Sequence, residues 1–185
     1  MKYSTSEILR ILEGGSKQEK ISIIESLWNS SDPEVINLVI ERLDDSEIAV
    51  RGESFSSLIL NENQITEHLI AALKHQSKNV RGFSSLILAN RMELDSIKDI
   101  IKLTKDQSSM VRSCALGALG YMKANEAIES IYSCLDDPNL EVKRSAISAG
   151  IDIGDKNILQ NIERFSDDED SEIRKLVSEA ITKFS

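Results

Sequence analysis

The sequence has few of the residues that mark tight turns, aromatic cores or covalent cross-links. Its 185 residues include 2 Pro, 8 Gly, 2 Cys, 1 Trp, 3 Tyr and 4 Phe. Scarce prolines and glycines argue against a fold rich in β-turns. Scarce aromatics leave the core to Leu, Ile, Val and Ala, which suit helices packed on helices. We therefore predict an all-α protein.

Metal, disulfide and catalytic chemistry have little support. Cys114 and Cys134 lie in no Cys-x-x-Cys pair and have no histidine nearby, so we expect reduced thiols. His68 and His75 lack a third ligand or an adjacent nucleophile and are expected on the surface. The acidic run at 167–172 lacks the glycine and terminal glutamate of an EF-hand loop. Because no glycine loop or catalytic triad is recognisable either, we predict no enzyme activity, cofactor or metal.

Charge and hydropathy restrict the partners. The formal net charge is -9, with 31 acidic against 22 basic residues, which opposes general attraction to nucleic acid or anionic membranes. No stretch approaches the roughly 18 apolar residues of a membrane span, and the first ten residues contain no apolar signal segment. We expect a soluble, cytoplasmic protein with a protein or peptide partner and no nucleic-acid or membrane partner.

One dipeptide pattern recurs along the chain. A β-branched residue followed by a basic one opens five apolar segments at spacings of 30, 31, 31 and 31 residues: Val50-Arg51, Val80-Arg81, Val111-Arg112, Val142-Lys143 and Ile173-Arg174. Within these segments small and apolar residues recur at helical spacing, as in Val142, Ala146 and Ala149. A polar turn and a further apolar segment precede each dipeptide. The repeating unit is therefore predicted to be helix, turn, helix.

The pattern predicts six units, the first of them degenerate because Glu19-Lys20 stands where the dipeptide is expected. The approximate repeats are 1-31, 32-62, 63-92, 93-123, 124-154 and 155-185. The predicted helices are 5–13, 17–29, 33–43, 47–60, 64–74, 78–90, 94–104, 108–120, 126–135, 139–152, 156–165 and 170–184. Asp32, Ser77 and Asp155 are the predicted N-caps. Because a helix pair cannot bury its apolar stripe alone, the repeats must stack, and we expect a single domain over 1-185.

The best copy of the repeat resembles a known family. It runs Val111-Arg112-Ser113-Cys114-Ala115-Leu116-Gly117-Ala118-Leu119-Gly120, followed by Leu135-Asp136-Asp137-Pro138 at the end of the next helix. This resembles HEAT repeats of the short variety named after the phycobilisome lyases. The resemblance implies a right-handed α-solenoid, or superhelix, of about six two-helix repeats of roughly 31 residues. It implies little about function, because the family includes scaffolds, chaperone-like lyases and nucleic-acid enzymes.

A column of basic residues allows two interpretations. Its members are Lys20, Arg51, Arg81, Arg112, Lys143 and Arg174. They resemble a ladder for phosphate groups. In four repeats, however, an acid lies six residues before the basic residue of the column, at Asp45, Asp106, Asp137 and Asp168. We therefore favour a structural role, in which the carboxylate and the basic side chain pair across one turn.

The HEAT resemblance also suggests where a partner sits. If the second helix of each repeat lines the concave face, positions three, four, seven and eleven of the dipeptide register point into a groove. The candidate partner-binding residues read from this register are Leu60, Phe83, Leu86, Cys114 and Tyr121. They form an apolar patch among small residues, as binding faces do. The alternative is that the register is shifted by one residue and these side chains belong to the core.

Three functions follow as hypotheses. The first is a monomeric, non-catalytic scaffold or adaptor that holds a protein or peptide in the groove. The second is a lyase-like or chaperone-like protein that handles a prosthetic group, as the family name invites. The third is a HEAT-like nucleic-acid glycosylase, which the acidic balance disfavours. The sequence identifies neither the partner nor the face of the solenoid that binds it.

Overall fold

The computed structural model describes residues 3–184, and all regular structure within them is helical. The chain forms two compact units, the first ending at Arg91 and the second beginning at Met92. The predicted all-α fold of two-helix repeats is confirmed in both units. The single domain over residues 1–185 stays a prediction.

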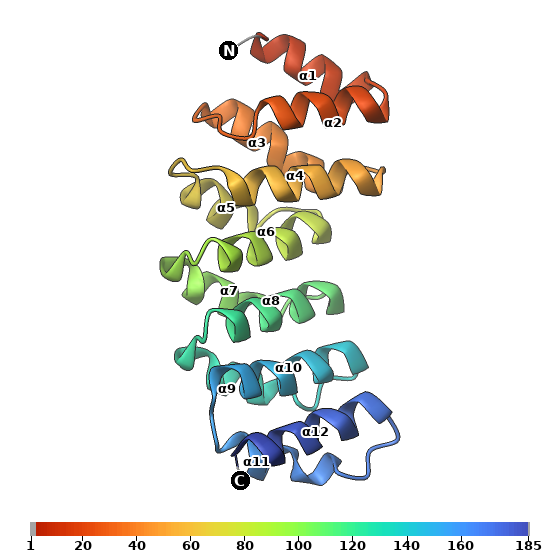
Figure 1. Ribbon diagram of the computed structural model, residues 1–185, viewed down its shortest axis with the longest axis vertical. Coiled ribbons are helices and arrows are strands. Elements are labelled where there is room, and N and C mark those ends of the chain that lie inside the picture. Colours follow the sequence, from red (N-terminus) through yellow and green to blue (C-terminus); the bar gives the residue numbers. More distant parts are fainter. Residues whose placement is uncertain (1–2, 185) are drawn as a thin grey trace. The chain divides into compact units, whose positions relative to one another are not determined.

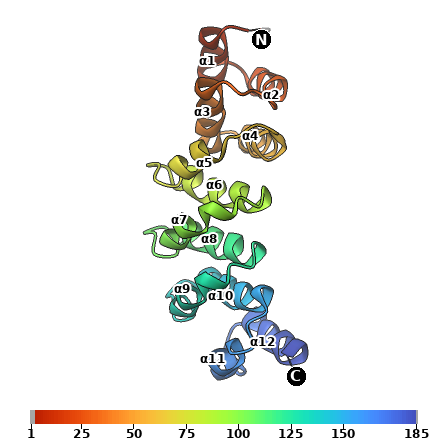
Figure 2. The same cartoon turned by 90° about the vertical axis from the view of Figure 1, so that its left-hand side faces the viewer.

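The first unit contains three helix pairs (Figure 1). They are α1 (Thr5–Gly14) with α2 (Lys17–Ser26), α3 (Pro33–Glu41) with α4 (Ile48–Leu60), and α5 (Thr66–Ala72) with α6 (Lys78–Asn90). A short 3-10 turn, η1 (Arg42–Asp44), extends α3. Contacts α1 to α3 and α3 to α5 build one layer, and contacts α2 to α4 and α4 to α6 build the other (Figure 2). The even-numbered layer carries the dipeptide register.

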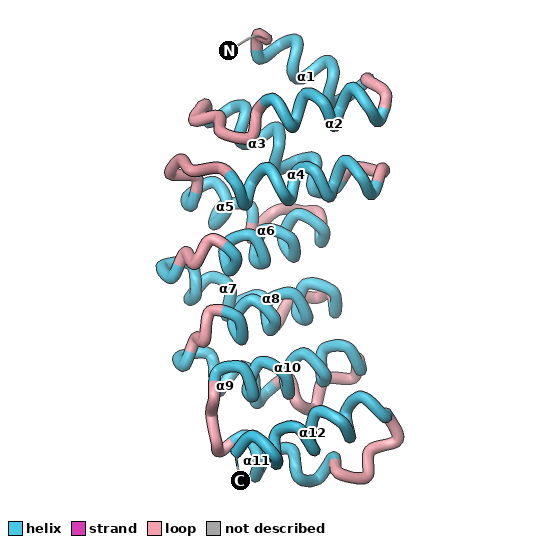
Figure 3. The backbone as a smooth tube through the Cα atoms, in the orientation of Figure 1, coloured by secondary structure: helices cyan, strands magenta, loops and turns pink. Residues whose placement is uncertain are grey.

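The second unit repeats the same arrangement. Its pairs are α7 (Ile97–Leu103) with α8 (Ser109–Tyr121), α9 (Ile128–Ser133) with α10 (Leu140–Ile153), and α11 (Ile158–Ile162) with α12 (Ser171–Phe184). The 3-10 turns are η2 (Leu94–Ser96), η3 (Asn125–Ala127) and η4 (Glu163–Phe165). Figure 3 shows the turns that separate the helices of each pair. Helix α10 packs against both α8 and α12 and is the centre of this unit's second-helix layer.

The recurring β-branched residue of the dipeptide is the centre of each repeat's core. Val50, Val80, Val111, Val142 and Ile173 are all 0% exposed. The remaining core is aliphatic, as expected from the scarcity of aromatics, and includes Leu58, Leu88 and Leu119. Burial of these side chains is the main favourable term in stacking the repeats.

Local signals set the helix starts. Asp32 accepts hydrogen bonds from the N–H groups of Glu34 and Val35, and Ser77 caps α6 in the same way, so both predicted N-caps are confirmed. The prediction for Asp155 is wrong, because α11 begins at Ile158 and Asn157 stands directly before it. The Asp155 carboxylate instead accepts the N–H of Asn157 at 3.1 Å and stabilises the preceding turn.

No helix in the described part of the chain is both long and apolar enough to cross a lipid bilayer.

Candidate partner-binding site

Two of the predicted partner-binding residues line one surface pocket of the first unit. Phe83 and Leu86 of α6 form one wall of a pocket of about 270 Å³. Four residues of α4 complete it: Ile48, Arg51, Gly52 and Phe55. The wall is almost entirely apolar, and its side chains stand on the second-helix layer, away from the buried valine register. Such concave, apolar surfaces are where ligands and partner side chains bind.

An aromatic pair connects the two helices at the pocket. The rings of Phe55 and Phe83 are 6.2 Å apart between centroids and meet edge to face at 76°. This geometry is favourable for two aromatic rings and holds both side chains in place. Phe83 and Leu86 are partly exposed, so neither is a core residue.

Sequence reasoning missed Ile48 and Phe55. Ile48 is 76% exposed at the first position of α4, where its side chain borders the pocket. Phe55 occupies position six of the register, which the groove rule leaves out. An exposed isoleucine two residues before the buried Val50 was the available signal, because the helical period turns it away from the core.

The other three predicted residues do not line this pocket. Leu60 is 62% exposed at the end of α4, and Tyr121 is 59% exposed at the end of α8 in the second unit. Cys114 borders a separate hollow of the second unit with Met110 and Ser113. Their predicted role in partner binding stays a prediction.

Burial changes the acid–base behaviour of Cys114. Desolvation raises the pKa of its thiol to about 11, so very little thiolate exists near neutral pH. We expect alkylation of Cys114 by iodoacetamide at pH 8 to be at least tenfold slower than that of a free cysteine, because the thiolate is the nucleophile. The rate should rise about tenfold per pH unit above pH 8. Peptide mapping by mass spectrometry measures it; a rate equal to that of free cysteine would contradict the desolvation of this partly buried thiol.

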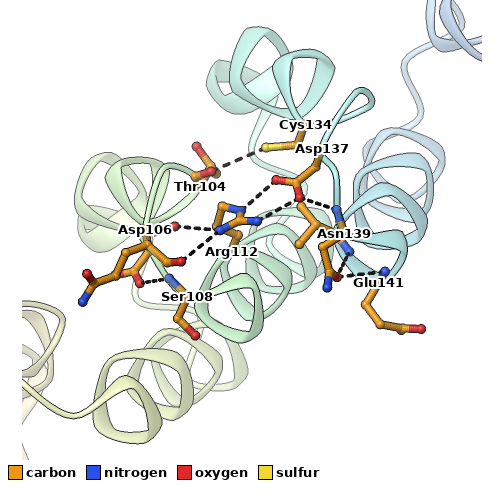
Figure 4. A network of polar contacts seen from close by, with 10 residues as sticks. Thr104, Asp106, Ser108, Arg112, Cys134, Asp137, Asn139 and Glu141 are labelled. Atoms are coloured by element: carbon orange, nitrogen blue, oxygen red, sulfur yellow. Dashed lines mark hydrogen bonds and ion pairs between the residues drawn. The ribbon is translucent and has the colours of Figure 1, made fainter.

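The basic column forms the main polar network of the repeats, and Arg112 shows it most fully (Figure 4). Its Nη1 donates to the carbonyl oxygens of Asp106 and Gln107, at 2.9 and 3.4 Å. Its Nε and Nη2 donate to the two carboxylate oxygens of Asp137, at 2.7 and 2.8 Å. One guanidinium therefore joins the turn of its own repeat to the turn of the next.

The predicted pairing of each basic residue with the acid six residues earlier is therefore wrong. Arg51, Arg112 and Arg174 contact the backbone carbonyl of that acid rather than its carboxylate. The carboxylate is already engaged, because its Oδ1 accepts the N–H two residues onward, as Asp45 does from Glu47 at 3.0 Å. Its other oxygen turns to the preceding repeat, where the amine of Lys20 donates to Asp45 at 2.8 Å.

These ion pairs lower the pKa values of the carboxyl groups that they contain. The hydrogen bond from Arg112 lowers the pKa of Asp137 below its usual range, against the opposing effect of burial. Burial raises the pKa of Asp45, but the hydrogen bonds from Lys20 and from the Glu47 N–H outweigh it and leave that pKa lowered. The column thus stabilises the stack of repeats through buried, ionised carboxylates.

The column is interrupted in the third repeat, where His75 stands at the position of Asp45, Asp106 and Asp137. Its Nδ1 accepts the Ser77 N–H at 3.1 Å, and its Nε2 lies 3.2 Å from Glu41. The histidine preserves the turn. It supplies no carboxylate to the arginine of the preceding repeat, Arg51.

Two carboxylates on α2 and α4 influence each other electrostatically. Burial, with a smaller contribution from the negative charge of Glu25 on α2, raises the pKa of Glu53. Neither carboxylate has a cationic partner among residues 3–184. No group of three His, Cys, Asp or Glu side chains in the described part of the chain is arranged to hold a metal ion.

Helix pairs that stack so that each repeat contacts its neighbours define the α-solenoid repeat proteins. Two sequence profiles place the chain within them. The profile described as HEAT repeats matches residues 66–150, and that described as HEAT repeat associated with sister chromatid cohesion matches residues 30–51. The chain is a HEAT-repeat protein. No curated protein sequence matches it.

Solved structures share this fold at low sequence identity. The CpcE–CpcF complex of phycocyanin lyase from Nostoc sp. PCC7120 matches with a TM-score of 0.67 and 18% identity, over 84% of this chain and 67% of that one. The YibA protein of E. coli matches with a TM-score of 0.68 and 20% identity, over 98% and 71%. A designed armadillo repeat protein in complex with a (KR)4 peptide matches with a TM-score of 0.57 and 16% identity, over 99% and 100%.

Proposed function

We propose that this protein is a non-catalytic scaffold that holds a segment of another protein, with the α4–α6 pocket as an anchor site. The exposed apolar pocket of about 270 Å³, with its paired Phe55 and Phe83, is the observation that carries this proposal. Aromatic side chains in well-packed pockets provide much of the binding energy of protein interfaces. We also propose that it acts as a cytoplasmic monomer, without nucleic-acid or membrane partners, which its net charge of -9 supports.

The repeat architecture supports the same proposal. Linear arrays of helix pairs present extended surfaces on which a partner chain lies along several repeats. The designed armadillo protein of similar fold is solved with a peptide bound. A fold alone does not determine function, so the proposal depends on the pocket itself.

Peptide selection tests the pocket directly. Peptides are selected on the wild-type protein from a displayed random library, and their affinity is then measured for the Leu86→Asp variant. Because Leu86 is partly exposed, the added carboxylate is tolerated by the fold but disrupts the apolar wall. We expect the affinity to fall at least tenfold, which corresponds to about 1.4 kcal/mol.

The matched control is Leu94→Asp. Leu94 is an exposed leucine, at 56%, in η2 of the second unit, and lines no part of the pocket. Peptides selected on wild type should bind this variant unchanged, while circular dichroism confirms that both variants are helical. Equal binding to wild type and both variants, or no enrichment of any peptide, would reject the proposed function.

A further inference from the structure

Arg51 is the one charged residue among those that line the pocket. Only one of the three nitrogens of its guanidinium group donates hydrogen bonds within residues 3–184. Its Nη1 donates to the carbonyl oxygens of Asp45 and Ser46, at 2.7 and 3.2 Å. These bonds fix the guanidinium beside the apolar wall. Its Nε and Nη2 donate to no residue within 3–184. Neither nitrogen is one of the buried side-chain atoms without a hydrogen-bond partner, so both are accessible to solvent.

The second unit shows which group a guanidinium in this register position binds. Arg112 holds its own turn through Nη1, as Arg51 does. Its Nε and Nη2 then form a two-point contact with one carboxylate, that of Asp137. Parallel N–H donors of arginine match the two oxygens of a carboxylate better than any other common group in proteins.

His75 prevents the neighbouring repeat from supplying this carboxylate. The Ser77 amide can only donate a hydrogen bond, so Nδ1 of His75 is the acceptor and carries no proton. The neutral ring then has its proton on Nε2, which faces the carboxylate of Glu41. Neither nitrogen remains to accept from Arg51. A carboxylate site is therefore built at the edge of the pocket without an internal carboxylate to fill it.

We propose that this site receives an acidic–apolar segment of a partner protein. A bulky apolar side chain enters the pocket between Phe55 and Leu86, and an adjacent Asp or Glu side chain makes with Arg51 the contact that Asp137 makes with Arg112. This inference rests on the proposed function and specifies the chemistry of the partner.

The acidic character of the protein does not oppose such a segment locally. Glu53 lies two residues after Arg51 on α4, about 200° further around the helix, and is not among the residues that line the pocket. More distant charges are screened beyond about 8 Å at physiological ionic strength. The charged residue that lines the pocket is therefore the positive Arg51, and the carboxylate of Asp45, whose carbonyl oxygen Arg51 contacts, is paired with Lys20.

Matched peptides test the charge preference. The probes are fluorescent peptides blocked at both ends, with Leu, Ile or Phe beside Asp, and the same peptides with Asn or Lys in place of Asp. We expect anisotropy titrations to show binding of the Asp series about five- to tenfold tighter than that of the Asn series, and weakest binding of the Lys series. In an added arm, Asn peptides with a free C-terminal carboxylate should not recover the lost affinity.

The variant His75→Asp tests the mechanism without touching the pocket. The new carboxylate should pair with Arg51 as Asp137 pairs with Arg112, and the preference for Asp over Asn peptides should disappear. His68→Asp is the control, because His68 lies on α5 and contacts Asn37 instead. It should keep the preference.

The outcomes separate this inference from the proposed function. Equal binding of the Asp, Asn and Lys series leaves the apolar pocket as a binding site and overturns the role of Arg51. Tighter binding of the Lys series, recovery by a free C-terminus, or a preference that survives His75→Asp also overturns the inference. If peptides selected on the wild type are insensitive to Leu86→Asp, the proposed function itself fails.

Discussion

Replacement of Gly120 by alanine should lower the free energy of unfolding of the second unit by about 2 kcal/mol. A Cβ atom at Gly120 would lie 2.8 Å from the Cα and 3.2 Å from the Cβ of Ala149 on α10. The first of these atoms is backbone, so the contact cannot be relieved by a side-chain rotation. Helices α8 and α10 must move apart, which loosens the packing of the unit's central pair.

Gly117 provides a matched control on the same helix. A Cβ atom there meets nothing within 4 Å. Because alanine loses less conformational freedom in a helix than glycine, Gly117→Ala should raise stability by about 0.5–1 kcal/mol. Urea denaturation followed by circular dichroism measures both variants. Shifts of the two midpoints in the same direction would show that α8 and α10 do not approach as closely as described.

Replacement of Asp137 by asparagine should cost the second unit about 2 kcal/mol at pH 7. The Asp137 and Arg112 side chains are only 9% and 15% exposed, so removing the negative charge leaves a poorly hydrated guanidinium without its counter-ion. Asparagine keeps an oxygen that can accept the Asn139 N–H, so the turn itself should persist. The loss therefore reports the ion pair between neighbouring repeats.

The pH dependence of this effect has a defined sign. Arg112 lowers the pKa of Asp137 from its ordinary value of 3.8, so the folded pKa lies below the unfolded one. The ion pair's contribution is therefore complete above about pH 4 and is lost as the pH falls through the folded pKa. The difference in stability between wild type and Asp137→Asn should be constant from pH 5 to 7 and shrink on further acidification.

The neighbouring Asp136 gives the control for the ion pair. It contacts Arg164 at 2.8 Å, but these side chains are 69% and 53% exposed. Solvent screens such a pair, so Asp136→Asn should change stability by less than about 0.5 kcal/mol. Thermal unfolding at several pH values compares the three proteins. A difference between wild type and Asp137→Asn that grows below pH 4 would contradict the assigned ion pair.

The candidate site was only partly predictable. The register placed Phe83 and Leu86 on an accessible face because they lie about 60° and 120° around α6 from the buried Val80. It missed Phe55, because whether that side chain faces a neighbour depends on how α4 and α6 are set against each other. It also grouped Cys114 and Tyr121 with residues of the other unit, since equivalent positions in a repeat do not by themselves indicate that two side chains are close in space.

The basic column shows the same limit. Its periodic spacing and the acids six residues earlier were visible in the sequence. The partner of each cation was not, because the carboxylate that Arg112 binds lies 25 residues ahead, in the next repeat. The sequence shows a histidine, His75, at a position that is aspartate in four other repeats. Its consequence, that Arg51 has no carboxylate from the next repeat, follows only once the aspartates are known to contact the preceding repeat.

By itself the sequence determined the helix pairs, the period of the repeat, the buried valine column and the caps at Asp32 and Ser77. These features depend on interactions within a few residues, which local composition and spacing encode. Tertiary structure decided which glycine touches a neighbouring helix, which carboxylate each basic residue binds, and which apolar side chains enclose a pocket. Those outcomes depend on the distance and rotation between stacked helices, which no single segment contains.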